Sequence, residues 1–174
     1  MGDEVWYATI VGVIVLSGLS IFYILYLAKI RRTKTNAAWK QAATELGFDF
    51  TPVTRIFGKY RMSGVIGKQL SCSVWAYTEP NGQGGYTTFM NYDVRFPQRL
   101  NKVKELLTPN IQSKLLEVNN VLKKVVVSDD SINSTRVSGF IRKSEILVQN
   151  VKLLIQLAEL IIPNEEVDSI FEEI

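Results

Sequence analysis

Carboxylates and a single thiol are the side chains of this sequence that could perform catalysis. Histidine is absent from all 174 residues, which excludes a Ser-His-Asp triad, a histidine general base and histidine-ligated metal or haem. Acid/base chemistry would fall to Asp49, Asp93, Asp129 and Asp130. Asp129 and Asp130 stand in a Ser-Asp-Asp-Ser segment typical of a turn, where aspartate caps backbone groups. No spacing in the sequence pairs these carboxylates across a site.

The one cysteine and the glycine-rich runs also lack a catalytic context. Cys72 alternates with Leu70 and Val74, which indicates a small core residue in a strand. The run Gly64-Val-Ile-Gly-Lys68 lacks the first glycine and the Ser/Thr of a phosphate-binding loop, so a hairpin turn is the better interpretation. We therefore expect no catalytic residue, no cofactor, no metal and no small-molecule substrate, and a protein that is not an enzyme.

A long apolar segment near the N-terminus is the clearest feature of the chain. Residues 5–28 contain no charged side chain. At ~1.5 Å per residue, such a helix crosses a hydrocarbon core of ~30 Å with some tilt. The alternatives are a buried helix of a globular protein and a cleaved signal peptide. A signal peptide should begin with basic residues, whereas this chain begins Met1-Gly2-Asp3-Glu4. We therefore expect one transmembrane helix.

The flanking charges predict how this helix is oriented. Four basic residues follow it within residues 29–34. Before it, the charged side chains of residues 1–4 are those of Asp3 and Glu4. The positive-inside rule then places the N-terminus outside and the rest of the chain in the cytoplasm. The membrane would be a cell or inner membrane, or one of thylakoid type. The residues expected at the membrane interfaces are Trp6, Tyr7, Tyr23, Tyr26, Lys29, Arg31 and Arg32.

Ala8 and Gly12 form a small-xxx-small pair that would let another helix approach closely. Chance occurrence of small residues in the span is the alternative.

Behind the span, periodicity predicts an α+β fold, with an antiparallel sheet covered by helices. Leu70, Cys72, Val74 and Ala76 alternate on one face of a strand. The expected divisions are an outside tail over 1–4, a transmembrane helix over 5–28, a basic juxtamembrane linker over 29–36, an α+β domain over 37–162 and an acidic C-terminal helix over 163–174. The expected elements are a helix opened by Thr35-Asn36 and closed by Gly47, a strand over 48–51, a hairpin of 61–66 with 68–77, a strand over 86–96, a helix from Pro109, a hairpin of 125–127 with 132–141 and a helix over 144–162.

A family resemblance rests on three parts of this domain. These are the run Trp39-Lys-Gln-Ala-Ala-Thr-Glu-Leu-Gly-Phe48, the run Met62-Ser-Gly-Val-Ile-Gly-Lys-Gln-Leu70, and a last helix containing Leu157-Ala158. Together they resemble uncharacterised bacterial single-pass membrane-anchored proteins, in which a similar helix precedes a similar hairpin. Met62 and Leu70 stand where that pattern has leucine and valine. The resemblance implies a cytoplasmic α+β domain on one span and carries no established activity.

Charge is distributed unevenly along the cytoplasmic part. Residues 29–124 hold 16 Lys and Arg against 6 Asp and Glu, a net charge of +10, and residues 125–174 hold 4 against 9, a net charge of −5. A basic section next to the membrane favours anionic lipid or acidic partner surfaces. Solvated faces and topology signals are the alternative explanation. We expect membrane lipid as a partner and no nucleic acid, because no nucleic-acid-binding motif accompanies the charge.

These observations favour a non-enzymatic single-pass accessory subunit or scaffold that presents its domain to other subunits of a membrane complex. The alternative function is a membrane-surface module that binds a lipid or small ligand. Trp75 and Tyr77 fall on the strand face opposite Cys72, and Tyr86 and Phe89 are expected beside them. These four are candidate partner contacts, because Trp and Tyr are common interface anchors. Coverage of these rings by the protein's own helices is the alternative.

Overall fold

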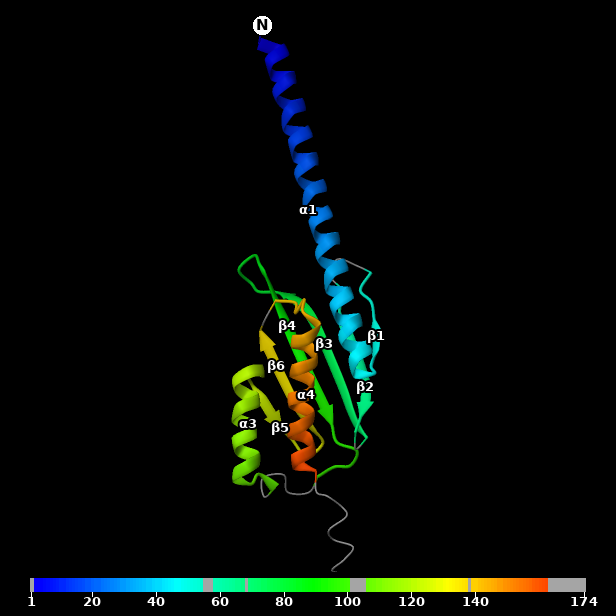
Figure 1. Ribbon diagram of the computed structural model, residues 1–174. Coiled ribbons are helices and arrows are strands. Elements are labelled where there is room, and N and C mark those ends of the chain that lie inside the picture. Colours follow the sequence, from blue (N-terminus) through cyan, green and yellow to red (C-terminus); the bar gives the residue numbers. More distant parts are fainter. Residues whose placement is uncertain (1, 55–57, 68, 101–105, 138, 163–174) are drawn as a thin grey trace, which may run out of the picture.

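The computed structural model describes residues 2–54, 58–67, 69–100, 106–137 and 139–162. Figure 1 shows a long helix that projects from one end of a small domain, in which a sheet is packed against helices. The helices and strands, in chain order, are α1 (Gly2–Leu46), β1 (Asp49–Thr51), β2 (Tyr60–Ile66), β3 (Leu70–Pro80), β4 (Tyr86–Arg95), α3 (Pro109–Leu122), β5 (Val125–Val127), β6 (Ser131–Val137) and α4 (Ser144–Ile161).

Helix α1 is continuous from Gly2 to Leu46, so the expected new helix start at Thr35-Asn36 is wrong, and the basic stretch 29–36 is helical. The Thr35 hydroxyl donates to the Arg31 carbonyl one turn back, at 2.9 Å, instead of capping a new helix. Asn36 is bound elsewhere: its amide donates to the Val53 carbonyl at 3.0 Å, and its oxygen accepts from the Val53 N–H at 3.1 Å. Both polar side chains therefore satisfy partners without breaking the helix.

The two halves of α1 have different surroundings. In the N-terminal half, an 18-residue window has a mean hydropathy of 2.4 and none of it is buried, so by length and composition this helix can cross a membrane. The first buried side chain along α1 is Thr35, among the side chains that the structure describes, and Trp39, Ala42 and Ala43 are almost completely buried. The helix thus changes from a wholly exposed apolar rod to a packed element of the domain within about two turns.

The described strands form one antiparallel sheet in the order β1-β2-β3-β4-β6-β5. The hairpins expected across residue 68 and across 128–131 are both present, and β6 ends at Val137, earlier than the predicted residue 141. The pairing of β4 with β6 joins the two hairpins into one sheet. The fold is therefore α+β, as expected.

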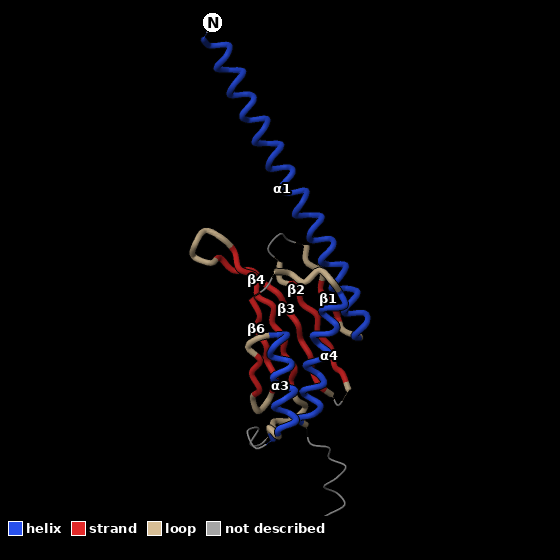
Figure 2. The backbone as a smooth tube through the Cα atoms, turned by 60° about the vertical axis from the view of Figure 1, so that its left-hand side comes forward, coloured by secondary structure: helices blue, strands red, loops and turns tan. Residues whose placement is uncertain are grey.

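In the described residues, all three helices lie against the same face of the sheet (Figures 1 and 2). The C-terminal half of α1 packs on β1 and β2, α4 on β4, and α3 on β5 and β6. The core between the layers contains the predicted alternating set Leu70, Cys72, Val74 and Ala76, all fully buried. The opposite face of the sheet has no described helix over it.

A polar pair in the core connects α4 to the sheet. The Asn150 amide donates to the Tyr92 hydroxyl at 2.9 Å, and both residues are at most 3% exposed. Burial raises the pKa of Tyr92 to about 12, although the Asn150 hydrogen bond and the Arg136 charge act in the opposite direction. Tyr92 therefore stays protonated at physiological pH and serves as a neutral hydrogen-bonding group.

The helix predicted over 144–162 is confirmed as α4, and Pro109 begins α3, with Thr108 as its N-cap. The acidic helix expected over 163–174 lies outside the described residues.

Candidate functional site

The most distinctive surface of the described residues is the sheet face without helices. Strand alternation and register place residues from neighbouring strands in rows across this face. One row runs Arg61, Trp75, Asn91 and Thr135, and the next runs Ser63, Ser73, Asp93 and Asn133. We call these two rows the polar rows. They differ in kind from the apolar rows on the helix-covered face.

Two members of the polar rows are more buried than an open face would suggest. Asn91 and Asp93 are each only 7% exposed. The Asn91 oxygen accepts from the Thr135 hydroxyl at 2.8 Å, but the Asn91 amide nitrogen has no hydrogen-bond partner. Leaving such a donor unsatisfied costs about 1–3 kcal/mol. Since buried polar groups are nearly always paired, this amide is an unusual unsatisfied donor beneath the helix-free face.

The Asp93 carboxylate lies one row away from this amide and accepts from Arg95 Nε at 2.9 Å. Arg95 itself is well exposed, so the pair sits at the boundary between the sheet and the solvent. The polar rows therefore combine a buried amide without a partner, a carboxylate bound by Arg95 and a hydroxyl bound to Asn91.

Aromatic rings border the polar rows. Tyr77 and Phe89 lie directly opposite each other on β3 and β4, and their rings stack with centroids 5.4 Å apart. Lys59 Nζ lies 5.8 Å from the centroid of the Tyr77 ring. Trp75 is partly exposed beside Asn91. The polar rows with these rings form one mixed surface on β3 and β4.

The structure therefore brings together three of the four candidate partner contacts. Tyr86 does not belong with them. It is separated from Met90 and Tyr92 by even numbers of residues along β4, and the side chains of those two residues face the helices, so strand alternation places Tyr86 on that face as well. The expectation that Tyr86 shares the outer face with Phe89 is wrong for this reason. Tyr86 begins β4 at the tip of the hairpin, and its side chain is exposed. A role of any of the four in partner binding stays a prediction.

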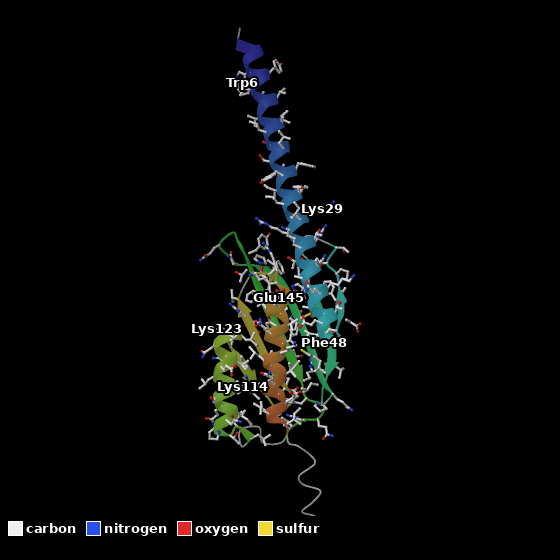
Figure 3. The ribbon with its side chains drawn as sticks, in the orientation of Figure 1. Trp6, Lys29, Phe48, Lys114, Lys123 and Glu145 are labelled. Carbon is white, nitrogen blue, oxygen red and sulfur yellow. The ribbon has the colours of Figure 1, made fainter. Side chains whose placement is uncertain are left out.

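The residues expected at a membrane interface are all on α1, before its first buried side chain, Thr35. Figure 3 shows Trp6 near the far end of the projecting helix and Lys29 just before the helix reaches the domain. Trp6, Tyr7, Tyr23 and Tyr26 are highly exposed, and Gly12 has nothing within 4 Å of a Cβ built on it. These aromatic side chains are therefore not packed against the domain, and their placement in a membrane stays a prediction.

The projecting helix is fastened to the domain by an aromatic cluster, which we call the junction: Trp39, Tyr60 and Phe140. The Tyr60 ring centroid lies 5.4 Å from that of Trp39 and 5.0 Å from that of Phe140. Trp39 Nε1 donates to the Ile141 carbonyl at 3.2 Å. Burial raises the pKa of Tyr60, opposed by a hydrogen bond to Thr35 and by the charges of Arg32 and Arg142. The junction therefore joins α1, β2 and the segment before α4.

The carboxylates considered for catalysis are far apart or engaged. Asp49 and Asp93 occupy the same row but are separated by β2 and β3, a distance of about 14 Å at ~4.8 Å per strand. Asp129 pairs with Arg99 at 3.3 Å, and Asp130 accepts from the Ser131 hydroxyl at 2.9 Å. No cluster of three metal-ligating residues occurs in the part of the chain that the structure describes. That the chain is not an enzyme stays a prediction.

Cys72 is fully buried on the helix-covered face. Burial raises the pKa of its thiol to about 12, and the negative charge of Asp93 adds to this effect. A thiol with so high a pKa carries almost no thiolate at neutral pH, which suits a structural residue.

A shallow depression of about 530 Å³ lies between α1 and β1, and its lining includes Asn36, Lys40, Thr44, Phe48 and Asp49. It contains one carboxylate and one amine among its lining residues and so lacks the paired groups of an acid/base site.

Comparison with protein-family models, with curated proteins and with solved structures found no match to this chain. Its function must therefore be inferred from its own geometry.

Proposed function

We propose that this chain is a non-enzymatic, single-pass accessory subunit that anchors a cytoplasmic α+β module in the membrane and presents its helix-free sheet face to another subunit. The observation that carries this proposal is the group of partly exposed rings, Trp75, Tyr77 and Phe89, on a sheet face that no described helix covers. A partner that packs on these rings would bury aromatic side chains of the types that commonly anchor protein interfaces.

The continuity of α1 supports an anchoring role. A flexible linker would allow the domain to rotate freely, whereas an unbroken helix fixes its height and direction relative to the span. Such a fixed geometry suits a subunit whose partner surface must meet another membrane protein at a defined height.

Partner binding can be tested by changing the two partly exposed rings of Trp75 and Tyr77 together. We expect the Trp75→Ser, Tyr77→Ser double variant to lose the membrane proteins that co-purify with the unsubstituted chain in mild detergent, because interface anchors of this kind carry most of the binding energy. Mass spectrometry of the retained proteins measures the loss. The matched control is Leu116→Ser with Leu160→Ser, which changes two exposed apolar side chains on helices. Equal retention by both double variants would reject this face as the partner surface.

A thermal unfolding measurement accompanies that experiment. An unchanged unfolding temperature with lost retention supports an interface. A large fall, as truncation of core side chains produces, would show that the rings stabilise the fold, and the partner surface would have to lie elsewhere.

Orientation in the membrane is tested with a cysteine at Gln83, an exposed residue of the β3–β4 tip. We expect an impermeant thiol reagent to label Gln83→Cys only after intact cells are permeabilised, because the basic flank keeps the domain in the cytoplasm. The buried Cys72 thiol has a raised pKa and should not react, and the unsubstituted chain is the control for this. A cysteine at Gly2 should be labelled in intact cells. The reverse pattern would overturn the orientation.

A further inference from the structure

Several loops lie at the end of the domain from which α1 projects. Figure 1 shows there the segment between β1 and β2, the β3–β4 tip and the segment between β6 and α4. We call this the proximal end, and it includes α1 residues 29–34. Its described residues are 29–34, 52–54, 58–59, 81–85 and 139–143.

The proximal end has charge of one sign only. Within its described residues, Lys29, Arg31, Arg32 and Lys34 come from α1, and Lys59, Arg142 and Lys143 come from the loops. None of these described residues is acidic; the nearest carboxylates along the chain are Glu45, Asp49, Glu79 and Glu145. Three separate stretches of sequence thus contribute cations to one end of the fold. These stretches are distant in sequence, and the topology of the fold brings them together.

Part of this charge is held in place by the fold. Arg32 Nη1 donates to the Thr54 carbonyl at 2.6 Å, which ties the β1–β2 segment to α1. The charges of Arg32 and Arg142, which come from different segments, both act to lower the pKa of Tyr60 at the junction. Lys59 is exposed and lies over the Tyr77 ring. Like charges gathered at one end repel one another and favour an anionic surface as a counterpart.

The distance to the apolar span is short. Arg32 follows the last residue of the apolar segment by four positions, a rise of about 6 Å along the helix. Since α1 is continuous, this spacing is fixed rather than set by a flexible tether. Loops at this height lie within about one Debye length, ~8–10 Å, of a bilayer surface in which the span is embedded.

We infer that the proximal end binds the anionic headgroups of the bilayer that α1 crosses, through Lys59, Arg142 and Lys143. This goes beyond the accessory role and depends only on α1 being a membrane span, so failure of the protein-partner experiment would leave it intact. Headgroup phosphates accept hydrogen bonds from these cations, and the domain is thereby seated on the membrane. The helix-free face extends from this end along the length of the sheet and stays available for another protein (Figure 1).

The test uses the full chain in nanodiscs, with a fluorophore on Gln83→Cys and a quencher attached to headgroups. We expect quenching to rise when zwitterionic lipid is replaced by a mixture with about one-third phosphatidylglycerol, and the rise to disappear at high salt. The variant Lys59→Gln, Arg142→Gln, Lys143→Gln should lose most of the rise, since each cation contributes roughly fivefold to the equilibrium.

A matched control carries the same loss of charge elsewhere. Arg99→Gln, Lys114→Gln and Lys152→Gln remove three cations that form surface ion pairs outside the proximal end. This control should keep the full rise in quenching. The charge-conserving variant Lys59→Arg, Arg142→Lys, Lys143→Arg should also keep it, which separates loss of charge from loss of fold. Quenching that is independent of phosphatidylglycerol, or a rise that is equal in the Gln variant, would overturn the inference.

Discussion

Replacing Trp39 with alanine will lower the free energy of unfolding of the domain by about 3–5 kcal/mol. Trp39 is fully buried and contacts the rings of Tyr60 and Phe50, and its indole N–H is bound to the Ile141 carbonyl. The truncation leaves a cavity between α1 and the sheet and orphans that carbonyl. Since small domains have a total stability of about 5–15 kcal/mol, much of the molecule should be unfolded at moderate denaturant.

Urea unfolding in mild detergent, followed by near-ultraviolet circular dichroism, measures this effect. Trp39→Phe keeps a ring and loses the hydrogen bond, so it should cost clearly less than alanine. Trp6→Ala is the control, because Trp6 is exposed on the projecting helix and makes no contribution to the core. A loss below about 1 kcal/mol for Trp39→Ala would show that the junction does not hold the domain together.

Placing valine at Gly64 should cost about 3 kcal/mol. A Cβ built at this position overlaps the Phe48 ring, with Cε1 at 2.9 Å and Cγ at 3.0 Å. Phe48 is buried between the end of α1 and β2, so its ring cannot move aside without disturbing the core. Crowding and not backbone conformation makes glycine necessary here.

A double-mutant cycle separates this cause from others. Phe48→Ala should relieve the overlap, so that the Gly64→Val, Phe48→Ala variant loses less stability than the sum of the single changes. Gly139→Ala should change the free energy of unfolding by no more than about 0.5 kcal/mol, because nothing lies within 4 Å of a Cβ there. Additive losses from Gly64→Val and Phe48→Ala would contradict the crowding explanation.

The strands and the later helices were readable from the sequence because local patterns determine them. Alternation of Leu70, Cys72, Val74 and Ala76 gives the strand and its buried face directly. Pro109 marks a helix start, and it occupies the first turn of α3. In each case the side chain acts on backbone within a few residues, so no knowledge of the tertiary fold is needed.

The continuity of α1 was not readable in the same way. Threonine and asparagine favour N-caps, and a polar stretch after an apolar span resembles a linker. What keeps the helix unbroken is tertiary: Asn36 binds both backbone groups of Val53, which is distant in sequence. The propensity for a cap was therefore overridden by a contact that local patterns do not contain.

The candidate site was found only in part. Trp75, Tyr77 and Phe89 were identified from their residue types and from strand alternation. Asn91 was missed, because its burial and its vacant N–H depend on the neighbours that β3 and β6 place beside it. The pairing of β4 with β6 joins segments separated by α3, and no turn or short-range pattern specifies it.

An unbroken α1 also sets an angular relation between its apolar half and the domain. At ~100° per residue, Gly12 points roughly 180° away from Trp39, the residue by which α1 packs on the domain. A second helix docked at Gly12 would therefore approach α1 from the side opposite to its contact with the domain. Adding a single residue to the helix near Lys29 would turn the domain by about 100° about the helix axis and move it ~1.5 Å farther from the apolar half. The register of this one helix therefore determines which way the sheet faces its neighbours.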